Sequence, residues 1–147
     1  MATVSGGERL EAYLKELAQK VSNPGTLRVG FFSRATYPDG TSVPMVAAIQ
    51  NYGAPSRGIP PRPFFTNFVS KGKKTWGKAL TTILQQNDYD ATRSLQLMGE
   101  GMRGELQASI TEGSYAPLKP ATVRRKGFDT PLIDTSNMLN SVESEVT

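Results

Sequence analysis

The feature that most constrains this chain is a proline-rich loop at residues 51–65. Prolines stand at positions 60, 61 and 63, on both sides of Arg62, and two adjacent phenylalanines, Phe64 and Phe65, follow directly. Each proline ring fixes its own φ and moves the preceding residue toward extended backbone. The loop is therefore predicted to hold one extended shape, and a rigid shape that ends in large apolar side chains is typical of a docking element.

A second segment, residues 118–135, has the same character, because it combines prolines with basic and apolar residues. We expect each segment to shape one protein–protein interface. The first set is Ile59, Pro60, Pro61, Arg62, Pro63, Phe64 and Phe65; the second is Arg124, Arg125, Lys126, Phe128, Leu132 and Ile133. The alternative is that the two phenylalanines close the core and the arginines are solvated.

Composition bounds the class of protein. The 147 residues are about one domain's length, and a 37% apolar content is too high for wholesale disorder. No run approaches the roughly 20 apolar residues of a membrane span, and the N-terminus does not read as a signal peptide, so we expect a cytoplasmic protein without membrane contact. The chain has neither cysteine nor histidine, which excludes disulfides, thiolates and imidazole chemistry.

The net charge of +4 is unevenly placed. No acidic residue lies between Asp39 and Asp88, and such acid-free basic stretches suit a polyanion or an acidic partner, or else form a solvated face. Aromatic residues at positions 65, 68 and 76 lie among the lysines, but their helical spacing favours core packing over base stacking. The candidate contacts to DNA phosphates are Lys71, Lys73, Lys74 and Lys78.

The first half of the chain predicts two helices and a strand. Ser5 can cap an amphipathic helix over about residues 5–22, which ends at the breaker before Gly25. Alternating residues over 27–32 predict a strand buried on one face, followed by a turn at 37–40. Residues 44–52 predict a short, mostly buried helix with Gly53 as its C-terminal cap.

The second half predicts further helices. Residues 64–84 show a helical face interrupted at 71–74, so one broken helix or two would fit. A long helix capped by Asp88 or Asp90 should run to Gly113. Its glycines at 99, 101 and 104 each cost about 1 kcal/mol relative to alanine, so we expect close helix–helix approach or a bend there.

The expected fold is therefore a single α+β domain over residues 1–147. A small mixed sheet would pack against two to four helices, with an extended proline-rich loop and a C-terminal arm at about 114–147. Residues 140–146 predict an edge strand, and this arm would close onto a sheet or onto a neighbouring subunit.

No convergent set of reactive groups emerges from the sequence. Asp88 and Asp90 are read as a capping pair, and Asp129 and Asp134 fit a tight turn better than a cation site. The glycines at 99–104 lack the strand and the Gly-Lys-Ser/Thr ending of phosphate-binding loops. We therefore predict no catalytic residue, no metal and no cofactor.

Six segments taken together resemble the tail-completion or neck proteins of long-tailed bacteriophages, and the similarity covers about residues 27–142. Their order and spacing carry the resemblance more than any one of them. They are residues 29–31 (Val-Gly-Phe), 37–41 (Tyr-Pro-Asp-Gly-Thr), 46–53 (Val-Ala-Ala-Ile-Gln-Asn-Tyr-Gly), 59–65 (Ile-Pro-Pro-Arg-Pro-Phe-Phe), 118–127 (Leu-Lys-Pro-Ala-Thr-Val-Arg-Arg-Lys-Gly) and 131–135 (Pro-Leu-Ile-Asp-Thr).

The resemblance implies a small α+β structural protein without catalytic residues. It would assemble in the host cytoplasm and reside in the virion neck, as a ring of its own copies, expected to be a hexamer. Its other partners would be the head–tail connector or adaptor proteins and the tail terminator or tail tube proteins. Genome DNA would pass through the ring and contact it non-specifically. The alternative function is a basic DNA-binding accessory protein without catalytic activity.

Two positions depart from the pattern of the family that the chain resembles. Gln50 stands where a glutamate is common before the aromatic residue, so no carboxylate contact is expected there. Ser136 stands where a glycine often follows the Asp-Thr pair.

Overall fold

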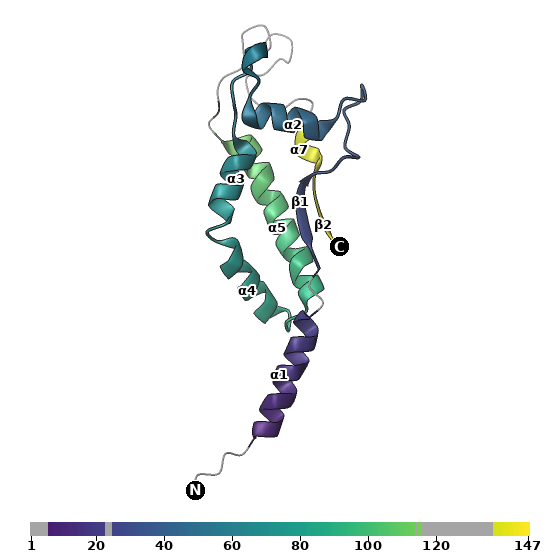
Figure 1. The fold of residues 1–147 in the computed structure, drawn as a ribbon, viewed down its shortest axis with the longest axis vertical. Coiled ribbons are helices and arrows are strands. Elements are labelled where there is room, and N and C mark those ends of the chain that lie inside the picture. Colours follow the sequence, from purple (N-terminus) through teal and green to yellow (C-terminus); the bar gives the residue numbers. More distant parts are fainter. Residues whose placement is uncertain (1–5, 23–24, 114, 116–136) are drawn as a thin grey trace.

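The computed structural model describes residues 6–22, 25–113, 115 and 137–147, and its path is shown in Figure 1. The helices and strands follow one another along an elongated molecule. They are α1 (Gly7–Val21), β1 (Leu27–Phe31), α2 (Val43–Tyr52), the 3-10 turn η1 (Pro55–Arg57), α3 (Phe64–Gly72), α4 (Trp76–Gln86), α5 (Ala91–Glu112), α7 (Asn137–Asn140) and β2 (Val142–Val146). The predicted α+β class is confirmed.

The longest helix, α5, lies in the middle of the body, between the sheet on one side and α3 and α4 on the other (Figure 1). Helix α2 crosses one end of this arrangement and contacts α3, α7 and β1. The predicted interruption at residues 71–74 separates α3 from α4, so the alternative of two helices is the correct one.

The sheet of the described residues consists of two antiparallel strands, β1 and β2, so a mixed sheet is not observed there. Leu27 pairs with Val146 at one end and Phe31 with Val142 at the other. Both predicted strands are confirmed, and the last residues of the chain close onto the sheet of their own subunit. Thr26 and Thr147 extend the pairing with two further backbone hydrogen bonds of 2.8 and 3.0 Å.

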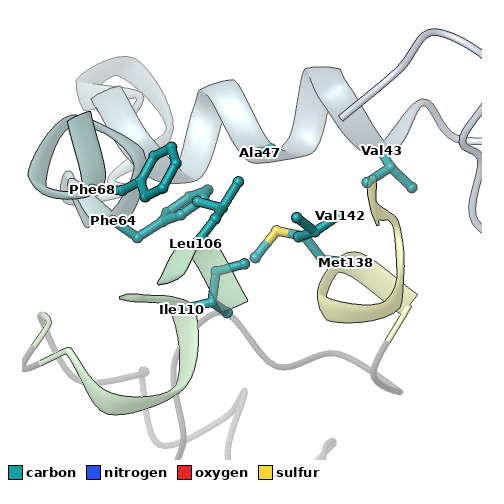
Figure 2. Close-up of a cluster of buried hydrophobic side chains, with 8 residues drawn as sticks. All are labelled: Val43, Ala47, Phe64, Phe68, Leu106, Ile110, Met138 and Val142. Atoms are coloured by element: carbon teal, nitrogen blue, oxygen red, sulfur yellow. The ribbon is translucent and has the colours of Figure 1, made fainter. Parts of the chain in front are cut away.

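One apolar core joins the elements, and Figure 2 shows its side chains. Leu106 and Ile110 of α5 lie at its centre and are 0% and 1% exposed. Residues from α2, α3, α7 and β2 surround them, so segments far apart in sequence depend on one another. The remaining members are Val43, Ala47, Phe64, Phe68, Met138 and Val142.

Side-chain caps define where two helices begin. Ser42 accepts a hydrogen bond from the Met45 amide at the start of α2, and Asp90 accepts one of 2.9 Å from the Arg93 amide at the start of α5. Asp90 is therefore the capping residue of the two candidates, as expected for short polar side chains at this position. Asp88 instead adopts a φ of 52° and forms an ion pair with Lys20 of α1.

The glycines of α5 do not serve close helix–helix approach, and that interpretation was wrong. Gly99 is buried against the sheet, where an added Cβ would lie 2.8 Å from Leu27 Cδ1 and 3.1 Å from Ser144 Cβ. Gly101 and Gly104 are exposed, and a Cβ added at either would meet no described atom within 4 Å. Of the three glycines, only Gly99 is therefore required by packing, and the contact is with the two strands of the sheet.

Helix α1 projects from one end of the body (Figure 1), and none of its residues is buried. It begins after Gly6, and the expected cap Ser5 lies outside the described residues. An ion pair of 2.6 Å between Lys20 and Asp88 ties its last turn to the body, and the hydrogen bond to Asp88 raises the pKa of Lys20.

A first prediction follows from the glycine of α5 that touches the sheet. Gly99→Ala should lower the free energy of unfolding by about 1–3 kcal/mol, because the methyl group overpacks the contact with Leu27 and Ser144. Urea denaturation would measure this. The matched control Gly101→Ala, on the open face of the same helix, should raise stability by up to about 1 kcal/mol, and equal effects of both changes would contradict the packing role.

Candidate functional site

The proline-rich loop is anchored by one buried polar side chain, Asn51 of α2, which is 3% exposed. Its Oδ1 accepts hydrogen bonds from the backbone amides of Phe65 and Thr66, at 3.0 and 3.1 Å. Its Nδ2 donates to Thr66 Oγ1 at 3.0 Å. The first amides of a helix have no partner within it, so Asn51 caps α3 from a distance and fixes where the loop ends.

A second anchor joins Gln50 to Arg62. The Arg62 amide donates to the Gln50 carbonyl at 2.7 Å, and Arg62 Nη1 donates to Gln50 Oε1 at 2.8 Å. Arg62 is only 5% exposed, and burial lowers the pKa of its guanidinium. Gln50, which stands where the family that the chain resembles often has a glutamate, therefore binds the buried Arg62 guanidinium through its neutral side-chain amide.

The chain can turn sharply into this loop because position 53 is a glycine. Gly53 has a φ of 76°, and a Cβ there would lie 2.8 Å from the Pro61 nitrogen and 2.9 Å from the Ile59 carbonyl oxygen. A small hairpin follows, in which Ala54 and Ile59 exchange backbone hydrogen bonds of 2.9 and 3.1 Å. The loop is thus folded back on its own anchor and is not fully extended.

The predicted interface residues of this loop divide into two groups. Phe64 and Arg62 are buried inside the subunit, at 0% and 5% exposure, so they shape the loop from within. Ile59, Pro63 and Phe65 are half-buried, whereas Pro60 and Pro61 are exposed. The members of this set that a partner could touch are therefore the three prolines, Ile59 and the exposed part of Phe65.

The phenylalanines and the tryptophan pack with one another. Phe65, Phe68 and Trp76 form a row with ring centroids 5.7 and 5.0 Å apart. Trp76 Nε1 donates to Glu105 of α5 at 2.8 Å, and its ring fills the space beside Gly72. The expectation of core packing over base stacking is confirmed for Phe68, which is 5% exposed, and its two neighbours pack against the same core.

Beside Phe65, the surface is hollowed into an apolar groove of about 310 Å³. The end of β1, one face of α2 and the start of α3 form its walls. None of the described residues that line it is charged. The lining residues are Val29, Gly30, Phe31, Phe32, Pro44, Ala47, Ala48, Asn51, Tyr52, Phe64 and Phe65.

A second hollow, of about 620 Å³, lies between α3 and α5. Its walls carry charges of both signs, from Lys71, Glu105 and Glu112. Tyr115 donates a hydrogen bond to the Ser109 carbonyl at its edge. The mixed lining does not favour one class of ligand.

The four candidate DNA-contacting lysines gather where α3 meets α4. Lys71, Lys73, Lys74 and Lys78 are all exposed. No ion pair to any of them is found among the described acidic residues. They form one basic corner, which is defined here by these four residues.

Helix α1 carries an apolar stripe. The sequence periodicity predicted this face of the helix but did not indicate that it is an interaction site. Leu10, Tyr13, Leu14 and Val21 are 58%, 51%, 54% and 40% exposed. Leu17 completes the stripe and is half-buried. The signal was present in the sequence, since five apolar residues at steps of three and four define one face, but the sequence did not say whether the body covers it.

The second predicted interface, Arg124, Arg125, Lys126, Phe128, Leu132 and Ile133, lies outside the described residues. Within the part of the chain that is described, no three acidic side chains converge as metal ligands would. No described helix combines the length and apolar character of a membrane span.

A second prediction concerns the anchor of the loop. Asn51→Ala should lower the free energy of unfolding by about 2–3 kcal/mol, because it leaves the Phe65 and Thr66 amides without their acceptor in a part-buried place. Thermal and urea unfolding would measure it. Asn67→Ala, on the exposed face of α3, is the matched control and should change stability by less than about 0.5 kcal/mol; a cost below 0.5 kcal/mol at Asn51 would contradict its anchoring role.

Comparisons with known proteins add no relative: no family model, no curated protein and no solved structure matches the chain.

Proposed function

We propose that this chain is a structural protein of a bacteriophage neck, which completes the tail and joins it to the head connector as an oligomeric ring. The resemblance of six segments to tail-completion and neck proteins gives this setting. The ring is expected to be a hexamer, with connector or adaptor proteins on one face and tail terminator or tail tube proteins on the other, and with genome DNA passing through it.

The observation that carries an assembly function is the uncovered stripe of α1. A 15-residue helix with four large apolar side chains at 40–58% exposure is at the limit of stability in water by itself. Contiguous apolar surface of this kind marks protein–protein contact in soluble proteins. The helix therefore gains stability from another molecule, as a subunit of an assembly does.

The loop anchors support the same function. Asn51 and Gln50 hold the proline-rich loop in one shape before any partner arrives. A preformed loop loses little conformational entropy on docking. The exposed prolines 60 and 61 are thus presented on a rigid support, which suits a repeated contact in a ring.

A second candidate function, a DNA-binding accessory protein, is favoured by the basic corner alone. Four exposed lysines without a described acidic partner can neutralise phosphates. Within the ring, the same corner would contact the passing genome.

A third prediction tests the joining role by the mass of the purified protein, alone and mixed with isolated tails or neck complexes of the same virus. Light scattering should give either a ring-sized mass for the protein alone or stoichiometric binding of the protein to the tails or neck complexes. Leu14→Glu should abolish it, because a charge would enter the apolar stripe. Ala12→Glu, on the opposite face of α1, should leave it unchanged. A persistent monomer that ignores both particles would overturn the joining role.

A fourth prediction separates the DNA-binding alternative. Changing the four lysines of the basic corner to glutamine should weaken the binding of short duplex DNA and flatten its salt dependence by about one logarithmic slope unit per lost phosphate contact. Fluorescence anisotropy at several salt concentrations would measure both. Unchanged affinity would show that the corner is a solvated face, and strong DNA binding without particle capture would favour the accessory protein.

A further inference from the structure

We propose that the apolar stripe of α1 from one copy docks in the apolar groove of the next copy. The groove is the one between the end of β1, α2 and the start of α3. This inference rests on the proposed ring and names the contact that would build it. One chain would give its helix to one neighbour and receive a helix from the other.

The helix has the pattern that helix-in-groove recognition uses. Leu10, Leu14, Leu17 and Val21 stand at i, i+4, i+7 and i+11, so they project from one side of α1. Over 15 residues the helix is about 22 Å long. None of its residues is buried by the described body of its own chain.

The groove offers a matching surface. Its walls include Phe32, Phe65, Ala48 and Tyr52, and Tyr52 is 74% exposed although it is a large aromatic residue. Helix α2, which forms one wall, has no charged residue along its whole length. An occupant with a charged face would lose its hydration there without gaining a partner, so the groove suits an apolar stripe.

Charge also favours α1 over another part of the chain as the occupant. Residues 7–21 contain three acidic and three basic residues, so the helix has no formal net charge, and the whole +4 belongs to the rest of the chain. Its two lysines pair with acids on the same helix, Lys15 with Glu11 and Lys20 with Glu16. A neutral helix in an uncharged groove brings two basic bodies together without placing like charges in the contact.

The occupant must come from a second copy. The Lys20–Asp88 ion pair holds the end of α1 beside the start of α5, whereas the groove lies at the end of the body that α2 crosses (Figure 1). The helix points away from that end and cannot fill the groove of its own chain. Contacts between two different surfaces of identical subunits are head-to-tail, and such contacts close into rings when the rotation permits.

The area of the proposed contact is too small for a stable dimer of two free copies and suits a contact that is repeated in a larger assembly. One face of a helix about 22 Å long and about 10 Å wide falls short of the roughly 800 Å² per partner that a stable complex takes. Two free copies should therefore associate weakly. A closed ring, in which every copy makes the contact twice, or a particle that aligns the copies, would stabilise it.

The competing arrangement is a pair of α1 helices packed stripe to stripe. It would be symmetric, would leave the groove empty and would not continue into a ring through the same surface. The two arrangements bring different residues together, so cross-linking separates them.

The test uses the absence of cysteine from the chain, which makes single-cysteine variants unambiguous. Full-length Leu14→Cys and Ala48→Cys proteins, one from the helix stripe and one from the groove, are mixed at high concentration and treated with a short bifunctional maleimide. We expect a mixed dimer in at least fivefold excess over that from Ala12→Cys with Ala48→Cys, whose helix cysteine is on the far side. Circular dichroism checks that each variant is folded.

The same mixture is then captured on isolated tails or neck complexes and cross-linked there. Leu14–Ala48 products in either setting support the docking. Capture without them overturns the docking but leaves the neck function in place. Failure of capture contradicts the neck function, and the reaction in solution still decides the docking. Products from Leu14→Cys alone, without mixed products, identify helix–helix pairing and overturn the inference.

Discussion

The structure depends on the burial of both sides of α5. Leu106 and Ile110 anchor the core shared with α2, α3, α7 and β2, while Gly99 lets the sheet approach the helix backbone. Because α5 packs against both strands, a helix that lies between them in sequence supports the pairing of the first strand with the last residues of the chain. Apolar burial is the dominant favourable term in folding, and here most of it converges on one element.

Onto this core the chain adds a rigid edge. Asn51 lies on the face of α2 that also carries Val43 and Ala47, eight and four residues earlier, so a polar side chain takes a core-facing position. A buried amide must find partners, and it finds them in the first amides of α3. These hydrogen bonds offset the cost of burying Asn51 and fix the geometry of the loop, which the hydrogen bond between Gln50 and Arg62 reinforces.

The surface features that point to function lie outside the apolar core. The apolar stripe of α1, the uncharged groove beside Phe65 and the basic corner at the junction of α3 and α4 lie in three different places. The first two match each other in chemistry and lie toward opposite ends of one chain. That arrangement suits a subunit that is completed by its neighbours, as the proposed neck function requires.

The sequence by itself determined the local elements, because their signals are local: the apolar periodicity of α1 and α5, the alternation of β1 and the glycine that ends α2 at position 53. It left the cap of α5 open between Asp88 and Asp90, and the structure assigns it to Asp90. It did not determine which residues face outward. Phe64 and Phe65 are identical neighbours, yet Phe64 is 0% exposed in the core and Phe65 is only half-buried. Likewise, three glycines in one helix have two different environments, and a periodic stripe in α1 remains uncovered. Exposure is set by contacts between segments distant in sequence, so only the tertiary structure decided it.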